Sequence, residues 1–233
     1  MADDEALKAL QAQVERLTRQ VGLLEDTHAV RTLHFKYGYY FDACLYEEVV
    51  DLFAEDARLY FLNGVFHGKA GVRRMYCDWL RPLWTPGRDG PVRGLLYDHL
   101  LLQDIVDVAP DGLTAKGRFR GLMQGGFHES VEKNNERLPR QGWEAGVYEN
   151  QYAKEDGVWK FKVFDYNMLW QADYEKGWAH SEVHLKPLTA TWPDDPIGPD
   201  ELRPVTPATW PETRVVPFHY PHPVTGKVWD PAT

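Results

Sequence analysis

Apolar residues near the N-terminus recur at alternating spacings of three and four residues. The positions are Leu7, Leu10, Val14, Leu17, Val21 and Leu24. They form an a/d seam over about three heptads, which predicts a helix over residues 5–26. Three heptads are marginal for a free coiled coil, so we expect the seam to pack on another subunit or on the body of the same chain.

The pattern after residue 26 predicts shorter elements. Asp26-Thr27 offers an N-cap for a second helix that runs to about Cys44. Its apolar positions are Val30, Leu33, Tyr37 and Phe41. The next predicted elements are a helix over 46–53, a strand over 59–62, a hairpin turn at Asn63-Gly64, a strand over 65–68 and a helix over 69–80.

The middle of the chain is rich in strand patterns. A loop with three Pro and three Gly spans 82–94. Predicted strands then cover 95–108, 113–124, 143–154 and 158–169, with turns at 110–112 and 155–157 and a polar hairpin tip or lid at 125–141. Helices first and antiparallel strands afterwards are typical of the α+β class.

The C-terminal segment, residues 187–233, has a different composition. It holds eleven of the sixteen prolines, which block both helices and central strands. It also contains Trp192, Trp210, Phe218, Tyr220 and Trp229. A solvated linker has few aromatic residues, so we expect an extended arm that packs on the body or on a neighbouring subunit. The predicted organisation is 1–26 (heptad helix), 27–186 (α+β domain) and 187–233 (arm).

Composition narrows the classes of function. The net charge of −9 argues against nucleic-acid binding, which depends on Lys and Arg neutralising phosphates. Two cysteines form neither a disulfide framework nor a four-Cys zinc site. An acidic N-terminus and short apolar runs indicate neither a secretory signal nor a membrane span, so we expect a cytoplasmic protein. Aromatic residues make up 13% of the chain and are suited to a core, an interface or a pocket for flat ligands.

Several segments together resemble the SnoaL-like branch of the nuclear transport factor two-like superfamily. They are Leu33–Asp42, Val50–Ala57, Gly64–Lys69, Tyr97–His99, Thr114–Arg118, Gly146–Glu149 and Asp156–Lys160. The resemblance covers about residues 25–170 and implies a cone, in which a curved antiparallel sheet wraps around helices and encloses a deep pocket. The superfamily holds enzymes, binding proteins and assembly modules, so the resemblance is more specific for fold than for function.

The resemblance also implies a catalytic pair. In the dehydratase-like pattern an acid at the end of the pocket helix and a His on the facing strand are catalytic, and these positions match Asp42 and His99. A second pocket His of that pattern is absent, with Gly117, Arg118 or Phe119 near its place. The residues themselves leave alternatives open, because His99 could be a core histidine and Asp42 could be a solvated helix end.

A narrower resemblance concerns the whole layout. The heptad helix, the cone and the aromatic arm look like the lignin-dimer γ-formaldehyde lyases of this superfamily, which act on diaryl-propane-type compounds. The match is one of layout and involves no diagnostic motif. It implies a cofactor-independent lyase, a homo-oligomer with a trimer slightly favoured over a dimer, and a small aromatic substrate.

The other candidate site residues are aromatic or cationic. Tyr37 is predicted to orient a substrate hydroxyl beside His99. The predicted substrate-binding residues are Tyr40, Phe61, Trp79, Arg120, Tyr148 and Trp170. Alternation places Lys116, Arg118 and Arg120 on one face of a strand, where three cations usually meet solvent, and which of them faces the pocket is left open.

No metal or cofactor site is predicted. His180 and His184 stand four residues apart, but the segment reads as extended chain and lacks further ligands. No dinucleotide fingerprint, phosphate loop or nucleophile elbow occurs in the sequence. The leading hypothesis is an acid–base lyase that releases formaldehyde from a lignin-derived dimer and leaves a stilbene. The alternatives are a dehydratase or isomerase of an aromatic or polyketide-like substrate, and a non-enzymatic binding or assembly module.

Overall fold

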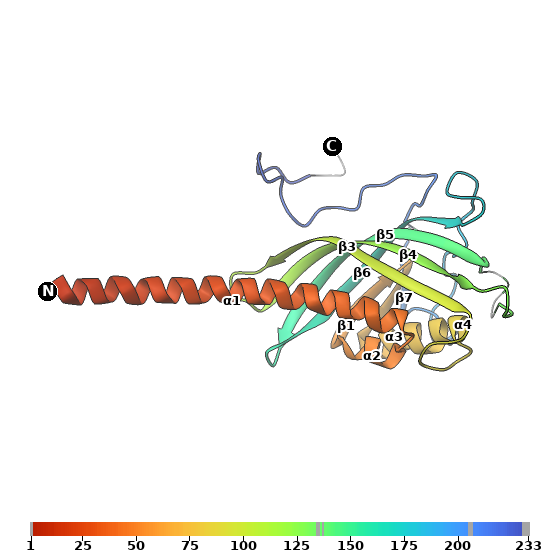
Figure 1. The fold of residues 1–233 in the computed structure, drawn as a ribbon, viewed down its shortest axis with the longest axis horizontal. Helices are drawn as coiled ribbons and strands as arrows, with labels where there is room; N and C mark the ends of the chain where they lie inside the picture. The colour runs from red at the N-terminus through yellow and green to blue at the C-terminus, as the bar shows by residue number, and fades with distance from the viewer. Residues whose placement is uncertain (1, 134–135, 137, 205–206, 230–233) are drawn as a thin grey trace.

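A curved sheet forms one layer of the fold, and helices cover its concave face (Figure 1). The computed structural model describes residues 2–133, 136, 138–204 and 207–229, and within them the sheet has the seven-stranded order β3-β4-β5-β6-β1-β2-β7. The strands are β1 (Phe53–Phe61), β2 (Gly64–His67), β3 (Leu95–Val108), β4 (Thr114–Phe127), β5 (Gln141–Glu155), β6 (Val158–Asp173) and β7 (Glu201–Leu202). The helices are α1 (Ala2–Asp42), α2 (Tyr46–Asp51), α3 (Gly68–Arg73), η1 (Arg74–Leu80, a π-helix) and α4 (Arg81–Trp84).

The sequence expectation for the fold class is confirmed. Neighbouring strands pair antiparallel except β1 and β6, which run parallel. The predicted bounds of β3 match the structure, and the other long strands extend a few residues beyond their predicted ends. The helix predicted over 69–80 is divided into α3 and η1, and the loop predicted over 82–94 begins inside α4.

The helix break predicted at Asp26-Thr27 is wrong, because α1 is continuous from residue 2 to residue 42. The Thr27 hydroxyl does not cap a new helix but donates a hydrogen bond to the Leu23 carbonyl one turn earlier. Asp26 is instead paired across the fold with Lys154 at 2.5 Å and with the Trp159 indole at 2.9 Å. The boundary expected at residues 26 and 27 therefore falls within one helix.

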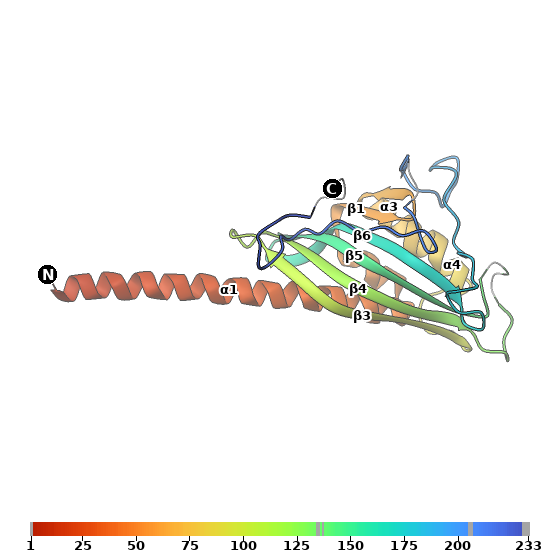
Figure 2. The ribbon, with the colours of Figure 1, turned by 90° about the horizontal axis from the view of Figure 1, so that it is seen from above.

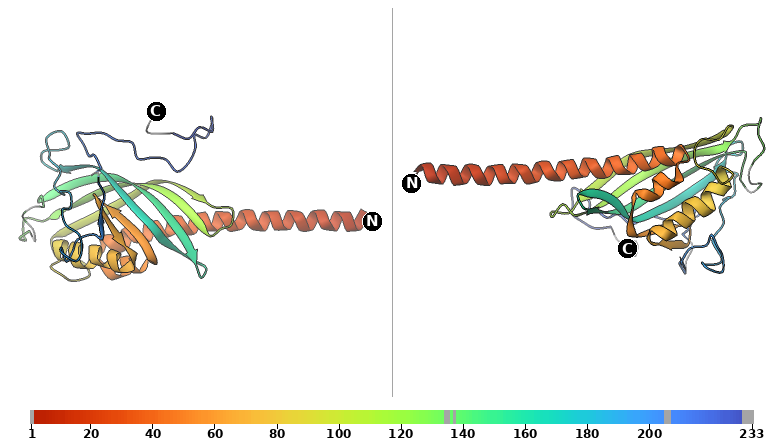
Figure 3. Two further views of the ribbon diagram at one scale, coloured as in Figure 1. Left: turned by 180° about the vertical axis from the view of Figure 1, so that it is seen from behind. Right: turned by 90° about the horizontal axis from the view of Figure 1, so that it is seen from below.

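The two halves of α1 have different environments. The N-terminal half projects away from the sheet, as Figures 1 and 3 show, and the seam residues from Leu7 to Leu24 are 47% to 70% exposed. The seam therefore does not pack on the body of its own chain. The C-terminal half buries Val30, Leu33, Tyr37 and Phe41, which share one helical face at spacings of three and four residues.

The C-terminal half of α1 lies along β3 and runs in the opposite direction. Arg31 forms an ion pair with Asp104 at 2.6 Å near one end of the contact. Gly38 lies against Leu101, where a Cβ atom would come within 2.8 Å of the leucine side chain. The missing side chain at Gly38 is thus what lets the helix approach the strand closely.

The arm packs on the body of its own chain, which is one of the two positions expected from the sequence. The Asn63 side chain both donates to and accepts from the backbone of Leu188, at 2.9 and 2.8 Å. Asp200 accepts a hydrogen bond from the His67 backbone amide and pairs with Arg74 at 2.5 Å. The arm then adds β7 beside β2 and crosses the outer face of the sheet (Figure 2).

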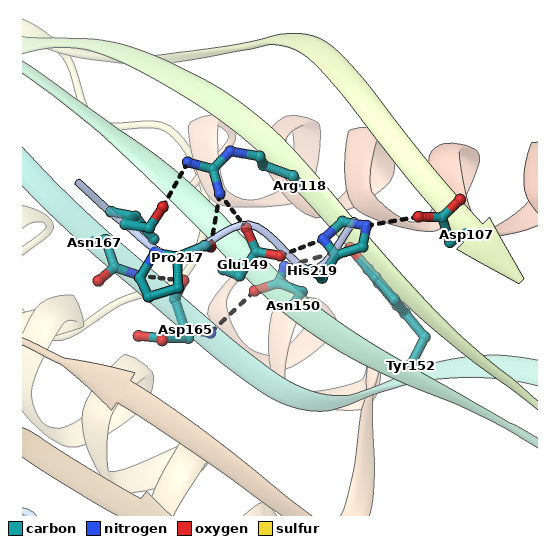
Figure 4. A network of polar contacts seen from close by, with 10 residues as sticks. Asp107, Arg118, Glu149, Asn150, Tyr152, Asp165, Asn167, Pro217 and His219 are labelled. Carbon is teal, nitrogen blue, oxygen red and sulfur yellow. Dashed lines mark hydrogen bonds and ion pairs between the residues drawn. The ribbon is translucent and has the colours of Figure 1, made fainter. Parts of the chain in front are cut away.

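A polar cluster fastens the arm to this outer face (Figure 4). Arg118 donates to the carbonyls of Val216 and Pro217 at 3.2 and 3.0 Å, and its guanidinium lies 4.5 Å from the centre of the Phe218 ring. The same guanidinium pairs with Glu149 at 2.5 Å. Arg118 therefore serves the arm and does not face the concave side.

Among the described residues, none of the helices combines the length and the hydropathy that a membrane span requires.

Replacing Arg118 by Ala is predicted to loosen the arm while leaving the cone intact. The substitution removes two hydrogen bonds and a ring contact, and a loss of about 1.4 kcal/mol of local stability corresponds to roughly tenfold faster cleavage. Limited proteolysis of residues 207–229, followed by mass spectrometry, measures the effect. Arg120→Ala, an exposed position on the same strand face, is the matched control and should be cleaved at the wild-type rate. Unchanged cleavage in Arg118→Ala would contradict this account of the arm.

Candidate active site

A cavity of about 120 Å³ opens on the concave face, between the sheet and the helices. Its wall is mostly aromatic and aliphatic. Aromatic rings are contributed by Tyr37, Phe41, Phe61, Tyr76, Trp84, Tyr97, Trp143, Tyr148, Phe164 and Tyr166. The polar wall residues besides the tyrosines are His99, Gln124, Glu144, Gln171 and His184. A few polar groups in an apolar concavity are typical of a small-molecule site.

Four cavity residues lie in one row across the sheet. Strand register pairs His99 with Met123, Met123 with Glu144, and Glu144 with Gln171. Residues in register on neighbouring strands point to the same face, so all four side chains reach the cavity from adjacent strands. The row therefore places a histidine and a carboxyl group on either side of Met123.

His99 is held by the last residue of α1. Its Nδ1 lies 2.6 Å from Oδ1 of Asp42, and the His99 residue is only 7% exposed. A carboxylate that accepts the Nδ1 proton keeps the lone pair on Nε2, which is then the nitrogen available to a substrate. The predicted partnership of Asp42 and His99 is thus present in the geometry, and it suits a general base.

Glu144 lies near the start of β5 in a different environment. Its Oε1 accepts a hydrogen bond from the Tyr166 hydroxyl at 2.8 Å, and its Oε2 accepts one from the Gln171 amide. Burial raises the pKa of Glu144, and the hydrogen bonds from Gln171 and Tyr166 and the nearby His99 offset only part of that effect. The site thus combines a histidine base with a carboxyl group whose surroundings favour its protonated form.

The orientation of Gln171 follows from its partners. Its side-chain oxygen accepts the backbone amides of His184 and Leu185, at 2.9 and 3.1 Å. The side-chain nitrogen must then face Glu144, where it donates. The segment that enters the arm thereby fixes the position of the Glu144 carboxyl.

Tyrosine hydroxyls supply the remaining polarity of the cavity. Tyr76 donates a hydrogen bond to Tyr37 at 3.1 Å, and both rings are buried. Burial raises the pKa of Tyr37, Tyr76, Tyr97, Tyr148 and Tyr166 well above the usual tyrosine value. These groups stay neutral and can donate or accept a hydrogen bond at the cavity wall.

The structure brings some predicted site residues together and separates others. Tyr37, Phe61, His99 and Tyr148 line the cavity, and Asp42 reaches it through His99. Tyr40, Trp79, Arg120 and Trp170 are not among the lining residues.

Each separated residue has a physical reason for its position. Tyr40 packs partly buried against the core, and Trp79 lies behind the cavity against Phe61 at 5.7 Å between ring centres. Arg120 is exposed on the outer face, because in β4 the small and aromatic residues on either side of it point inward. Trp170 packs on Trp178, because a bulge in β6 reverses the alternation ahead of it. These four residues, predicted to bind substrate, thus lie outside the wall of this cavity.

Sequence reasoning missed Glu144, Tyr97 and Gln171. A signal existed for the first two, because residues two and four apart on a strand share a face. Glu144 shares its face with Tyr148, and Tyr97 shares its face with His99. Gln171 carried no such signal, since the bulge in β6 changes the alternation before it.

Within the described residues, no group of three or more His, Cys, Asp and Glu side chains could hold a metal ion. His180 and His184, the pair weighed as ligands from the sequence, lie in the irregular segment after β6. Burial lowers the pKa of His184, which keeps its ring neutral at the cavity wall.

Comparison with known proteins identifies the family of this chain. A SnoaL-like domain model matches residues 23–165. A Novosphingobium aromaticivorans protein, described provisionally as a scytalone dehydratase, superposes with a TM-score of 0.53 at 20% identity, over 66% of this chain and 91% of that one. Hexachlorocyclohexane dehydrochlorinase LinA-type3 from Novosphingobium barchaimii LL02 gives 0.52 at 18% identity, over 72% and 99%. No curated protein sequence matches the chain significantly.

The solved structures share the fold at low identity, and the family model covers the end of α1 as well as β3, β4 and β5. The chain therefore belongs to the SnoaL-like domain family, and both Asp42 and His99 lie inside the matched region.

Proposed function

We propose that this protein is a cofactor-independent lyase that acts on a small aromatic substrate. The observation that carries the proposal is the His99–Asp42 pair, which opens into a cavity lined by aromatic rings. Such a pair can take a proton from a bound substrate, and one positioned acid or base contributes on the order of 10²–10⁴-fold in rate. The fold relatives named as a dehydratase and a dehydrochlorinase support this class of reaction.

The specific reaction that we propose is the fragmentation of a diaryl-propanediol, as found in lignin-derived dimers. Nε2 of His99 takes the proton of the terminal hydroxyl, and the oxygen lone pair forms the carbonyl of formaldehyde. The carbon–carbon bond breaks, its electron pair forms the stilbene double bond, and the protonated benzylic hydroxyl leaves as water. The products are one stilbene, one water and one formaldehyde, so the reaction needs neither an oxidant nor a reductant.

The cavity size constrains how such a substrate binds. An engineered apolar cavity of about 150 Å³ holds one benzene molecule. The cavity here, at about 120 Å³, thus takes about one aromatic ring. A two-ring substrate would place its second ring in the open mouth of the cavity, whereas a single-ring substrate would fit inside it.

The size of the cavity favours one alternative. Dehydration of a single-ring hydroxy compound needs the same base and the same hydroxyl departure, without the breaking of a carbon–carbon bond. A non-enzymatic binding module is the third hypothesis, and in that case the His99–Asp42 pair would be dispensable.

Two probes test the lyase proposal. A diaryl-propanediol with methoxy groups on both rings is assayed for formaldehyde and stilbene absorbance, and β-hydroxypropiophenone is assayed for phenyl vinyl ketone. We expect turnover of at least one probe, and His99→Ala should lower it by at least ~10²-fold. The melting temperature of the variant serves as the folding control. A wild-type protein that turns over neither probe, or full activity in His99→Ala, would contradict the proposal.

Asp42→Asn is predicted to lower turnover as well, because an amide cannot stabilise a charged imidazole. The double variant should be barely slower than the slower single variant, since residues that act as one unit are non-additive. Kinetics of the three variants on the same probe measure this coupling. Strictly multiplicative losses would show that the two residues act separately.

Activity is predicted to survive exhaustive chelation and desalting, because the proposed steps are proton transfers among side chains. Turnover is compared before and after treatment with a chelator, and then after adding back zinc or magnesium. Loss of activity that a divalent ion restores would overturn the acid–base mechanism.

We also propose that the seam of α1 joins copies of this chain. The seam is exposed, and the positions that would flank it in a coiled coil are mostly uncharged, namely Ala6, Gln11, Gln13, Thr18, Gln20 and Glu25. Self-association therefore meets little like-charge repulsion. The resemblance to the formaldehyde lyases favours a trimer slightly, whereas Val at two a positions and Leu at every d position suits two strands.

The wild-type protein is accordingly expected to form particles of at least twice 26.9 kDa in light scattering. Replacing Leu10 and Leu17 by Lys should shift the mass toward that of one chain, because charges would enter the apolar seam. Replacing Lys8 and Arg16, which lie off the seam, by Gln is the matched control. A wild-type particle with the mass of one chain would contradict the proposal.

A further inference from the structure

We propose that Glu144 is the general acid of this site, which protonates the leaving hydroxyl while His99 acts as the base. The inference rests on the lyase function proposed above and adds the second proton carrier that the reaction needs. It starts from geometry, because Glu144 and His99 occupy the same row of the sheet and both line the cavity.

The spacing of the strands leaves room for a ligand between His99 and Glu144. His99 and Glu144 lie on strands that are two apart, and neighbouring strands are about 4.8 Å apart, so their backbones are roughly 10 Å from each other. Met123 occupies the position between them. A ligand lying over Met123 would have the base on one side and the carboxyl group on the other.

The hydrogen bonds around Glu144 limit where its proton can go. Both carboxyl oxygens accept, one from Tyr166 and one from Gln171, and neither of these bonds uses the carboxyl proton. Gln171 cannot rotate to accept from Glu144, because its oxygen is held by the amides of His184 and Leu185. Tyr166 differs from Gln171, because its hydroxyl can donate to Met123 Sδ at 3.6 Å and then accept the Glu144 proton. A hydroxyl of a ligand in the cavity therefore competes with Tyr166 alone for the proton of a neutral Glu144.

The proton balance closes within the site. The Glu144 proton passes to the benzylic or β hydroxyl, whose carbon–oxygen bond breaks with its electron pair so that water leaves. His99 gains the proton that the substrate loses and is stabilised by Asp42. Each turnover thus leaves Glu144 ionised and His99 charged, and a single proton transfer from His99 to Glu144 resets both groups.

The test varies the leaving group. Each hydroxyl probe is paired with the ester that carries acetate in place of the departing hydroxyl, and the alkene product is measured. Acetate leaves as a stable anion, so its departure does not need the acid. Glu144→Gln should lose at least ~10²-fold in kcat on the hydroxyl probe and less than ~10-fold on the acetate probe. His99→Ala should lose activity on both.

Controls separate this assignment from a structural role. Glu155→Gln, at the far end of the same strand, should leave both activities unchanged. If the Gln variant does not fold, Glu144→Asp keeps a transferable proton, and its loss should again be larger on the hydroxyl probe than on the acetate probe. Equal losses on the two probes, or no loss in Glu144→Gln, would overturn the role of Glu144 while the His99 result stands. Inactivity of the wild-type protein on all probes would instead overturn the lyase function and the inference with it.

Discussion

The close contact between α1 and β3 is the constraint on which the site depends. The helix rises 1.5 Å per residue and a strand about 3.3 Å, so four helical residues span nearly the length of two strand residues. Gly38 touches Leu101, and four residues along the helix Asp42 meets His99, two residues back along the strand. Because these two lengths are nearly equal, the close contact at Gly38 also determines that Asp42 lies beside His99 at the end of the helix.

This contact also explains why Asp can end a helix there. A carboxylate at a helix C-terminus is disfavoured by the helix dipole and needs a compensating partner. His99 provides that partner at 2.6 Å, and its Nδ1–H donates to one oxygen of the carboxylate. A residue that is locally unfavourable is thus held by a tertiary contact, which is common where function and not stability selects the residue.

The glycines of the sheet make the aromatic cavity possible. A Cβ on Gly146 would come within 2.6 Å of the Tyr166 ring, and one on Gly121 within 3.0 Å of the Tyr148 ring. These two glycines are paired in the row next to that of His99 and Glu144. The absence of these side chains leaves space for the rings of Tyr166 and Tyr148 next to the row of His99 and Glu144. Polar groups and aromatic rings therefore line the same concave surface.

Local patterns predicted much of this arrangement, and failures coincide with irregular backbone. The periodicity of Val30, Leu33, Tyr37 and Phe41 predicted the buried face of α1. Asp42, at the end of that face, was implied only by the resemblance to the SnoaL-like branch. Alternation works along β4, but β6 carries two register shifts, after which Gln171 faces inward and Trp170 does not. A bulge depends on the partner strand, so a single sequence carries no signal for it. The exposure of the seam could not be predicted locally either. The seam lies on the part of α1 that extends past the end of β3, and the length of β3 is not encoded in the sequence of α1.

The bulge in β6 also connects the segment that leads into the arm with Glu144 in the cavity. By turning Gln171 inward, the bulge places its amide between the backbone of His184, just before the arm, and the carboxyl of Glu144. The same arm continues to the outer face, where Arg118 and Glu149 hold it in place (Figure 4). Glu149 and Glu144 lie on one strand, five residues apart and on opposite faces. The chain after β6 therefore reaches β5 from both faces, directly at Glu149 outside and by way of Gln171 of β6 at Glu144 inside.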